Sequence, residues 1–111
     1  MKKENWIWMP HAGHLIVGSY CQFKLNTYVG GYIVSTVGEY KSSRSKEGDD
    51  FETIGCDRIY ETMVFRAVKS ENECCPYEME SPGEIDFAGY NDAEKAMKGH
   101  YKFCKKWAKR K

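Results

Sequence analysis

The chain has 111 residues and a formal net charge of +1, so it is long enough for one domain with its own core, and its balanced charge indicates no polyanionic partner. Its five cysteines are odd in number, and no apolar run follows the basic start, which predicts no signal peptide and a reducing, cytoplasmic setting. No stretch approaches the roughly 18 apolar residues of a membrane span, which excludes a transmembrane class and a membrane partner.

The start of the chain places Trp6 and Trp8 among charged residues, and we expect residues 1–10 to dock loosely on a single domain spanning 1–111. The short apolar run HLIVGSY, residues 14–20, is consistent with a strand. The next segment, CQFKLNTYVGGYIVSTVGEY, gives a clearer signal. Its Gly30-Gly31 pair lies between two alternating stretches, which predicts a two-residue hairpin turn.

The predicted hairpin has one apolar face and one mostly polar face. With the turn at Gly30-Gly31, Val29 lies opposite Tyr32. The face that they share is suited to a core and also carries Phe23, Leu25, Thr27 and Val34. The other face is polar apart from three residues that we expect to be covered: Tyr28, Ile33 and Val37.

Three segments follow the hairpin. Residues 41–50, KSSRSKEGDD, have no apolar side chain and predict a flexible surface loop. Residues 59–68, IYETMVFRAV, are largely apolar on both alternating faces and predict a central strand. The turn-rich segment 70–89 predicts a loop with a short edge strand near residues 84–87.

The strongest pattern is a C-terminal amphipathic helix. Asn91 and Glu94 have the spacing of an N-cap and an N3 residue, and the helix is predicted to run to about Lys109. One stripe is expected to face the sheet: Ala93, Ala96, Met97, His100, Tyr101, Cys104, Trp107 and Ala108. The predicted fold class is α+β, a small curled antiparallel sheet of about four strands with one C-terminal helix packed on it.

His100 and Cys104 lie one helical turn apart on that stripe. A structural zinc site needs about four nitrogen or sulfur ligands, and a helix can supply two at this spacing. Zinc therefore stays open as a cofactor, with a pool of candidate ligands: His11, His14, Cys74, Cys75, His100 and Cys104. We favour a half-buried, hydrogen-bonded His100, Cys104 as a small hydrophobic side chain and no cofactor, because no cysteine pair has C-x2-C spacing. Catalysis by a Cys104 thiolate is disfavoured because a helix face under a sheet gives a substrate little access.

The basic helix end, KKWAKRK, suggests a second binding chemistry, in which nearby aromatic rings stack on bases. The residues that would hold nucleic-acid phosphates are Lys105, Lys106, Lys109 and Arg110. Cations in the last turn of a helix also stabilise it by complementing the helix dipole, so these basic residues do not require a nucleic-acid partner. The segment 69–94 carries eight acidic residues against one basic residue, and it would offset this basic field if it folded nearby.

Three motifs together resemble a family of small proteins encoded mainly by bacteriophages and prophages. They are VSTV at 34–37, YETMVF at 60–65 and YNDAEKAMKGH at 90–100, and the resemblance covers residues 34–100. In that family a VSTV strand precedes ETMVF and a helix of the form EEAxxGH. The resemblance implies a shared fold, a phage source and a bacterial host cell, but no catalytic assignment. This chain departs from the pattern at KSSRSKEGDD, where relatives have a short apolar, glycine-rich segment.

The family motif includes Gly99-His100 but requires no cysteine at the position of Cys104, which weighs against an obligatory zinc pair. We expect Gly99 to let the helix approach the strand 59–68 closely, and His100 to bond to Glu61 or Thr62. The favoured function is a non-enzymatic phage protein that binds or inhibits a host or phage macromolecule, a protein rather than nucleic acid. Nucleic-acid association and zinc binding are the alternatives.

Overall fold

The structure is a computed structural model that describes residues 6–9, 21–40, 58–71, 75–80 and 83–109. The strand predicted at 14–20 and the loop predicted at 41–50 lie outside these ranges. The described residues form one antiparallel sheet and one C-terminal helix, so the predicted α+β class is confirmed. The sheet has six strands, two of them only two and three residues long, where the sequence predicted about four.

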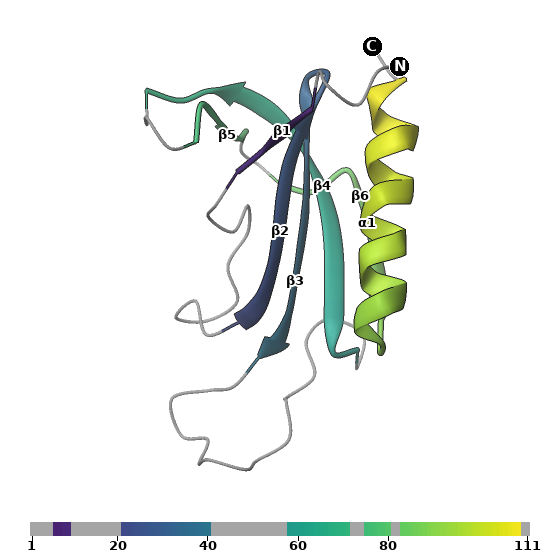
Figure 1. The fold of residues 1–111 in the computed structure, drawn as a ribbon. Coiled ribbons are helices and arrows are strands. Elements are labelled where there is room, and N and C mark those ends of the chain that lie inside the picture. Colours follow the sequence, from purple (N-terminus) through teal and green to yellow (C-terminus); the bar gives the residue numbers. More distant parts are fainter. Residues whose placement is uncertain (1–5, 10–20, 41–57, 72–74, 81–82, 110–111) are drawn as a thin grey trace.

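The strands follow the order β1-β2-β3-β4-β5 across the sheet, and β6 pairs with β4 beside this path (Figure 1). Every pairing is antiparallel. The elements are β1 (Ile7–Trp8), β2 (Cys21–Val29), β3 (Tyr32–Tyr40), β4 (Tyr60–Lys69), β5 (Tyr77–Met79), β6 (Asp86–Tyr90) and α1 (Ala93–Ala108).

The β2–β3 hairpin has the predicted turn and register. Gly30 and Gly31 have φ angles of 53° and 103°. A residue with a Cβ atom adopts such positive φ angles only with strain. Val29 pairs with Tyr32, and Thr27 pairs with Val34, as the alternation predicted. One face of this hairpin therefore turns toward α1 and supplies Val29 and Val34 to the core.

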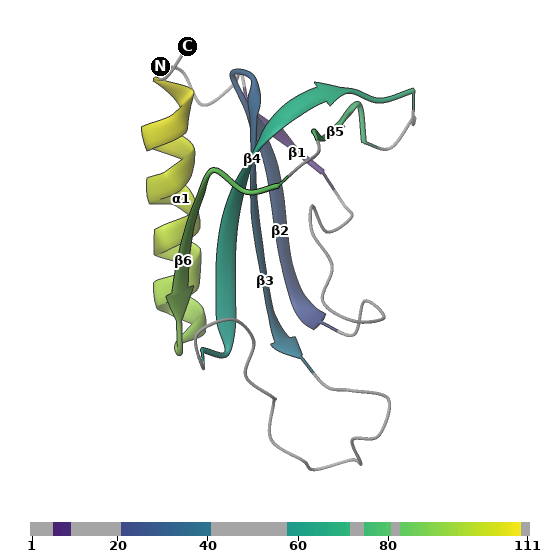
Figure 2. The same ribbon diagram turned by 180° about the vertical axis from the view of Figure 1, so that it is seen from behind.

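β4 is the central strand, as predicted, and it has two different partners along one edge. Residues 60–64 pair with β6, whereas Ala67–Lys69 pair with β5. The last part of β4 bends away from α1, and β5 lies there, while Figure 2 shows β6 running alongside the helix. The edge strand expected near 84–87 is found at Asp86–Tyr90.

The bend of β4 brings β5 over the face of the sheet opposite the helix. Tyr77 of β5 stacks on Tyr28 of β2, with ring centroids 3.7 Å apart and planes 9° from parallel. These strands are separated by β3 and β4 in the sheet order, so the contact requires a curled sheet. Ile33 and Val37 on this face are buried, which confirms that part of it is covered.

The helix begins one residue later than predicted. Asp92, not Asn91, is the N-cap, because the Asp92 carboxylate accepts hydrogen bonds from the backbone amides of Glu94 and Lys95. Asn91 instead accepts a hydrogen bond from the backbone amide of Ile59, the residue before β4.

Gly99 lies against β6 and not, as predicted, against β4. A Cβ at this position would overlap the Tyr90 hydroxyl oxygen. The absence of a side chain at Gly99 therefore lets the Tyr90 ring lie against the helix backbone, and sets how closely α1 approaches the sheet.

Candidate functional site: a surface patch above a buried histidine

His100 is fully buried between α1 and the sheet, and both of its ring nitrogens have a threonine partner. Nε2 lies 2.9 Å from the Thr27 hydroxyl of β2, and Nδ1 lies 2.7 Å from the Thr36 hydroxyl of β3. The Thr36 hydroxyl in turn lies 2.6 Å from the hydroxyl of Thr62 in β4. One helical side chain thus connects three strands, two directly and the third through Thr36.

This arrangement corrects the partner predicted for His100. Thr62 belongs to the network but contacts His100 only through Thr36. Glu61 follows the opposite alternation in β4, and its side chain therefore belongs to the other face of the sheet. The alternating register, in which Thr36 pairs with Thr62, explains why a histidine above them meets Thr36 first.

The buried network has the properties of a structural core and not of a catalytic centre. Burial lowers the pKa of His100 to about 4, so the imidazole is neutral at pH 7. Burial also raises the pKa of the Cys104 thiol to about 12, against an opposing hydrogen bond from Thr27. A neutral imidazole and a protonated thiol, both without solvent access, give neither an accessible base nor a thiolate.

The predicted zinc ligands are not brought together within the described part of the chain. Those residues contain no group of three or more histidine, cysteine, aspartate or glutamate side chains placed to hold a metal ion. A metal on His100 would also have to displace one of its two threonine partners. Of the remaining pool, Cys75 is half-buried just before β5, and His11, His14 and Cys74 lie outside the described residues.

Above the histidine, three large side chains form an exposed apolar surface, here named the Trp8 patch: Trp8, Met97 and Tyr101. Their exposed fractions are 46%, 49% and 38%. The predicted core stripe is therefore wrong for Met97 and Tyr101, which occupy its edge and reach solvent. The other members of the stripe are buried or half-buried.

The Trp8 patch is continuous with the core. The Trp8 ring lies 5.5 Å from the His100 ring and 5.6 Å from the Tyr101 ring, measured between centroids. The ring centroid of the buried Trp6 lies 6.0 Å from that of Tyr101. β1 is held to β2 by the pairs Ile7–Tyr28 and Trp8–Thr27, which puts Trp8 beside the threonine that bonds to His100. The exposed rings thus rest on packed side chains and paired strands.

The outward face of α1 next to this patch is basic. Four exposed lysines, here named the lysine ridge, recur at helical spacing along it: Lys98, Lys102, Lys105 and Lys109. Glu94 is the acid in the first turn, and it forms an exposed ion pair of 3.2 Å with Lys98. An open hollow on this face is lined by Glu94, Met97, Lys98, Tyr101, Lys102 and Lys105.

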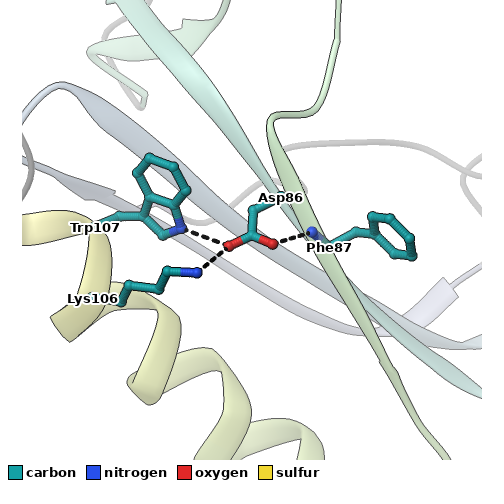
Figure 3. A network of polar contacts seen from close by, with 4 residues as sticks. All are labelled: Asp86, Phe87, Lys106 and Trp107. Atoms are coloured by element: carbon teal, nitrogen blue, oxygen red, sulfur yellow. Dashed lines mark hydrogen bonds and ion pairs between the residues drawn. The ribbon is translucent and has the colours of Figure 1, made fainter.

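Lys106, one of the predicted phosphate ligands, is engaged within the protein. Figure 3 shows the Asp86 carboxylate between α1 and β6, where one oxygen accepts from Lys106 Nζ at 2.8 Å and from the Trp107 indole at 3.1 Å. Burial acts to raise the pKa of Asp86, but bonds from Lys106, Trp107 and the Phe87 amide hold it below its usual value. Lys105 and Lys109 remain exposed, and Arg110 lies outside the described residues.

Comparison with protein families, curated proteins and solved structures finds no match for this chain. The resemblance to phage proteins therefore stays a prediction. Among the described residues there is no helix with the length and apolar character needed to cross a membrane.

Sequence reasoning identified His100 but missed the Trp8 patch as a composite surface. Met97 and Tyr101 fit the apolar stripe, and only their position at its margin, next to the lysines, signals solvent exposure. Of the two tryptophans near the start of the chain, Trp8 contributes to this surface, whereas Trp6 is buried.

Proposed function

We propose that this chain is a non-enzymatic protein, encoded by a phage or prophage, that binds or inhibits a host or phage macromolecule, and that the Trp8 patch is its contact surface. The observation that supports the proposal is the exposure of a tryptophan ring packed on a tyrosine ring, with a methionine that lines the same hollow as the tyrosine. Aromatic residues and methionine are enriched at protein interfaces, and tryptophan and tyrosine dominate their binding energy. A protein partner is therefore the best fit.

The architecture under the patch favours binding over chemistry. The histidine and cysteine of α1, His100 and Cys104, are both buried, the first neutral and the second protonated at pH 7. The exposed rings, in contrast, are supported from below and need little ordering when a partner binds.

The test is recovery of partners from a bacterial lysate with tagged wild-type protein and with two separate variants, Trp8→Ser and Met97→Ser. The control is Phe87→Ser, which removes the most exposed of the described large apolar side chains, at 58%, from a different element. A partner retained by wild type and by the control, but lost from both patch variants, is the expected result. Far-UV circular dichroism of each variant checks that the fold is retained. A partner recovered equally by all four proteins would contradict the proposal.

The second candidate function is nucleic-acid binding, favoured by one observation, the row of exposed lysines on α1. Its test is binding of single-stranded DNA at low salt by wild type and by the double variant Lys105→Glu/Lys109→Glu. Binding that weakens steeply with salt and in the variant would support it. No binding at low salt would rule out nucleic-acid binding as the function.

A further inference from the structure

We propose that the partner of the Trp8 patch is an acidic protein segment with at least one large apolar side chain, which enters the hollow beside Met97 while its carboxylates face the lysine ridge. This inference rests on the proposed function and adds the chemistry of the partner.

The lysine ridge gives this surface a positive charge. It spans residues 98–109, from within α1 to its C-cap, which is about 16 Å at the rise of an α-helix. Among the described residues, Glu94 is the acid that pairs with a ridge lysine, Lys98, at the N-terminal end. Lys102, Lys105 and Lys109 form no ion pair with another described residue, and this part of the ridge complements a row of carboxylates over a similar length.

The hollow combines positive charge with an apolar floor. Met97 and Tyr101 line the same hollow as Lys98, Lys102 and Lys105, so one ligand can contact both kinds of side chain at once. Exposed ion pairs contribute little affinity each, but they raise association rates and select partners. Burial of an apolar side chain against Met97 would supply the affinity, because the gain is roughly proportional to the apolar area removed from water.

Two other occupants fit this surface less well. A nucleic-acid backbone would bring phosphates to a hollow that contains the Glu94 carboxylate, and the ridge lysine next to it, Lys98, is already paired. A second copy of the chain, docked ridge to ridge, would place like charges against each other. The asymmetry of the site, apolar on the β1 side and basic on the outward side, matches a segment that is itself apolar on one side and acidic on the other.

The experiment is selection of a displayed random-peptide library on four immobilised proteins. They are wild type, the charge variant Lys98→Glu/Lys102→Glu/Lys105→Glu, the apolar variant Met97→Ser, and the control Lys24→Glu, which reverses an exposed lysine of β2. Wild type and control are expected to enrich the same peptides, rich in aspartate and glutamate around a leucine, phenylalanine or tryptophan. The Kd of a synthesised winner should rise roughly tenfold or more in the charge variant, and also between about 50 and about 300 mM salt.

Each contrary outcome has a distinct meaning. Peptides that depend on Met97 but carry no acidic residues would overturn this inference and leave the proposed function standing. Enrichment that is unchanged by the Met97 and lysine substitutions, or no enrichment at all, would overturn both. Displacement of the winning peptide by a thymidine oligonucleotide of about 20 nucleotides would indicate that the partner is nucleic acid and not an acidic segment. Dimerisation of wild type that is lost in Met97→Ser would indicate that the partner is a second copy of the chain.

Discussion

Acidification is expected to destabilise this fold through His100. The pKa of His100 is about 4 in the folded chain because the ring is buried, against 6.5 for an exposed histidine. Between these values the unfolded chain binds a proton that the folded chain does not. The contribution of neutral His100 to the free energy of unfolding is therefore complete above about pH 6.5. It is lost progressively as the pH falls toward 4, by roughly 3 kcal/mol in total. A domain of this size is stable by about 5–15 kcal/mol, so the loss is large.

The cost arises from burial of charge and not from loss of hydrogen bonds. Each threonine hydroxyl can rotate to accept a hydrogen bond, so Thr27 and Thr36 could both accept from a protonated ring, while Thr36 donates to Thr62. The imidazolium would then be bonded but would still lie in a site with no exposure to water.

The assay is urea unfolding at a series of pH values, read by far-UV circular dichroism, for wild type and His100→Gln. The substitution itself should cost about 1–3 kcal/mol at pH 7, because it leaves a buried threonine hydroxyl without its ring partner. Between about pH 6.5 and 4 the wild type should lose about 3 kcal/mol more than the variant. Proton NMR of the ring gives the pKa directly, since the chain has three histidines and only one signal should vanish in the variant.

A His100 ring that titrates near 6.5, or identical pH dependence in wild type and variant, would refute the assignment of a buried neutral histidine. Asp86 does not produce the same result, because its pKa is lowered below 3.8 and its contribution to stability is lost at more acidic pH.

Three further changes test the contacts that hold the sheet and helix together. Gly99→Ala should lower stability by roughly 1–3 kcal/mol in thermal unfolding, because the new Cβ would overlap the Tyr90 ring; the exposed helix variant Lys98→Ala, which should change it little, is the control. Tyr77→Ala should cost about 1 kcal/mol and speed amide exchange in β5, since it removes the stack on Tyr28; unchanged exchange would argue against that anchor. Asp86→Asn should cost about 1 kcal/mol or less, a loss that shrinks at high salt, and a salt-independent loss would implicate its other hydrogen bonds.

The parts of the fold that the sequence predicts are those with strong periodic patterns. Gly30-Gly31 between alternating segments predicted the hairpin and its register, because only glycine readily adopts two successive positive φ angles. The apolar character of both faces of IYETMVFRAV predicted that β4 is central. β1 and β5 were missed because two or three residues cannot show a period.

The partners of individual side chains were harder to predict than the elements. The alternation that places Thr27, Thr36 and Thr62 on one face is visible in the sequence, but the position of His100 over them depends on where the helix crosses the sheet. The way in which the helix crosses the sheet also determines that Gly99 lies against Tyr90 of β6. It further determines that the Met97 and Tyr101 side chains lie outside the core and reach solvent. The position of His100 on the stripe that faces the sheet was thus predictable, whereas its full burial and its contacts were not.

The adjacent pair Gly99 and His100 also has a consequence for how the outer surface is presented. His100 reaches β2 and β3, while Gly99 contacts β6, so the two residues fix α1 from different directions. A slide of the helix by one turn, about 5.4 Å, would break the threonine bonds and remove the glycine from the Tyr90 ring. Rotation about the helix axis would do the same. The lysines and Met97 on the far side therefore keep a constant orientation relative to Trp8, as in a preorganised binding face, and a partner would meet a rigid template whose shape does not depend on induced fit.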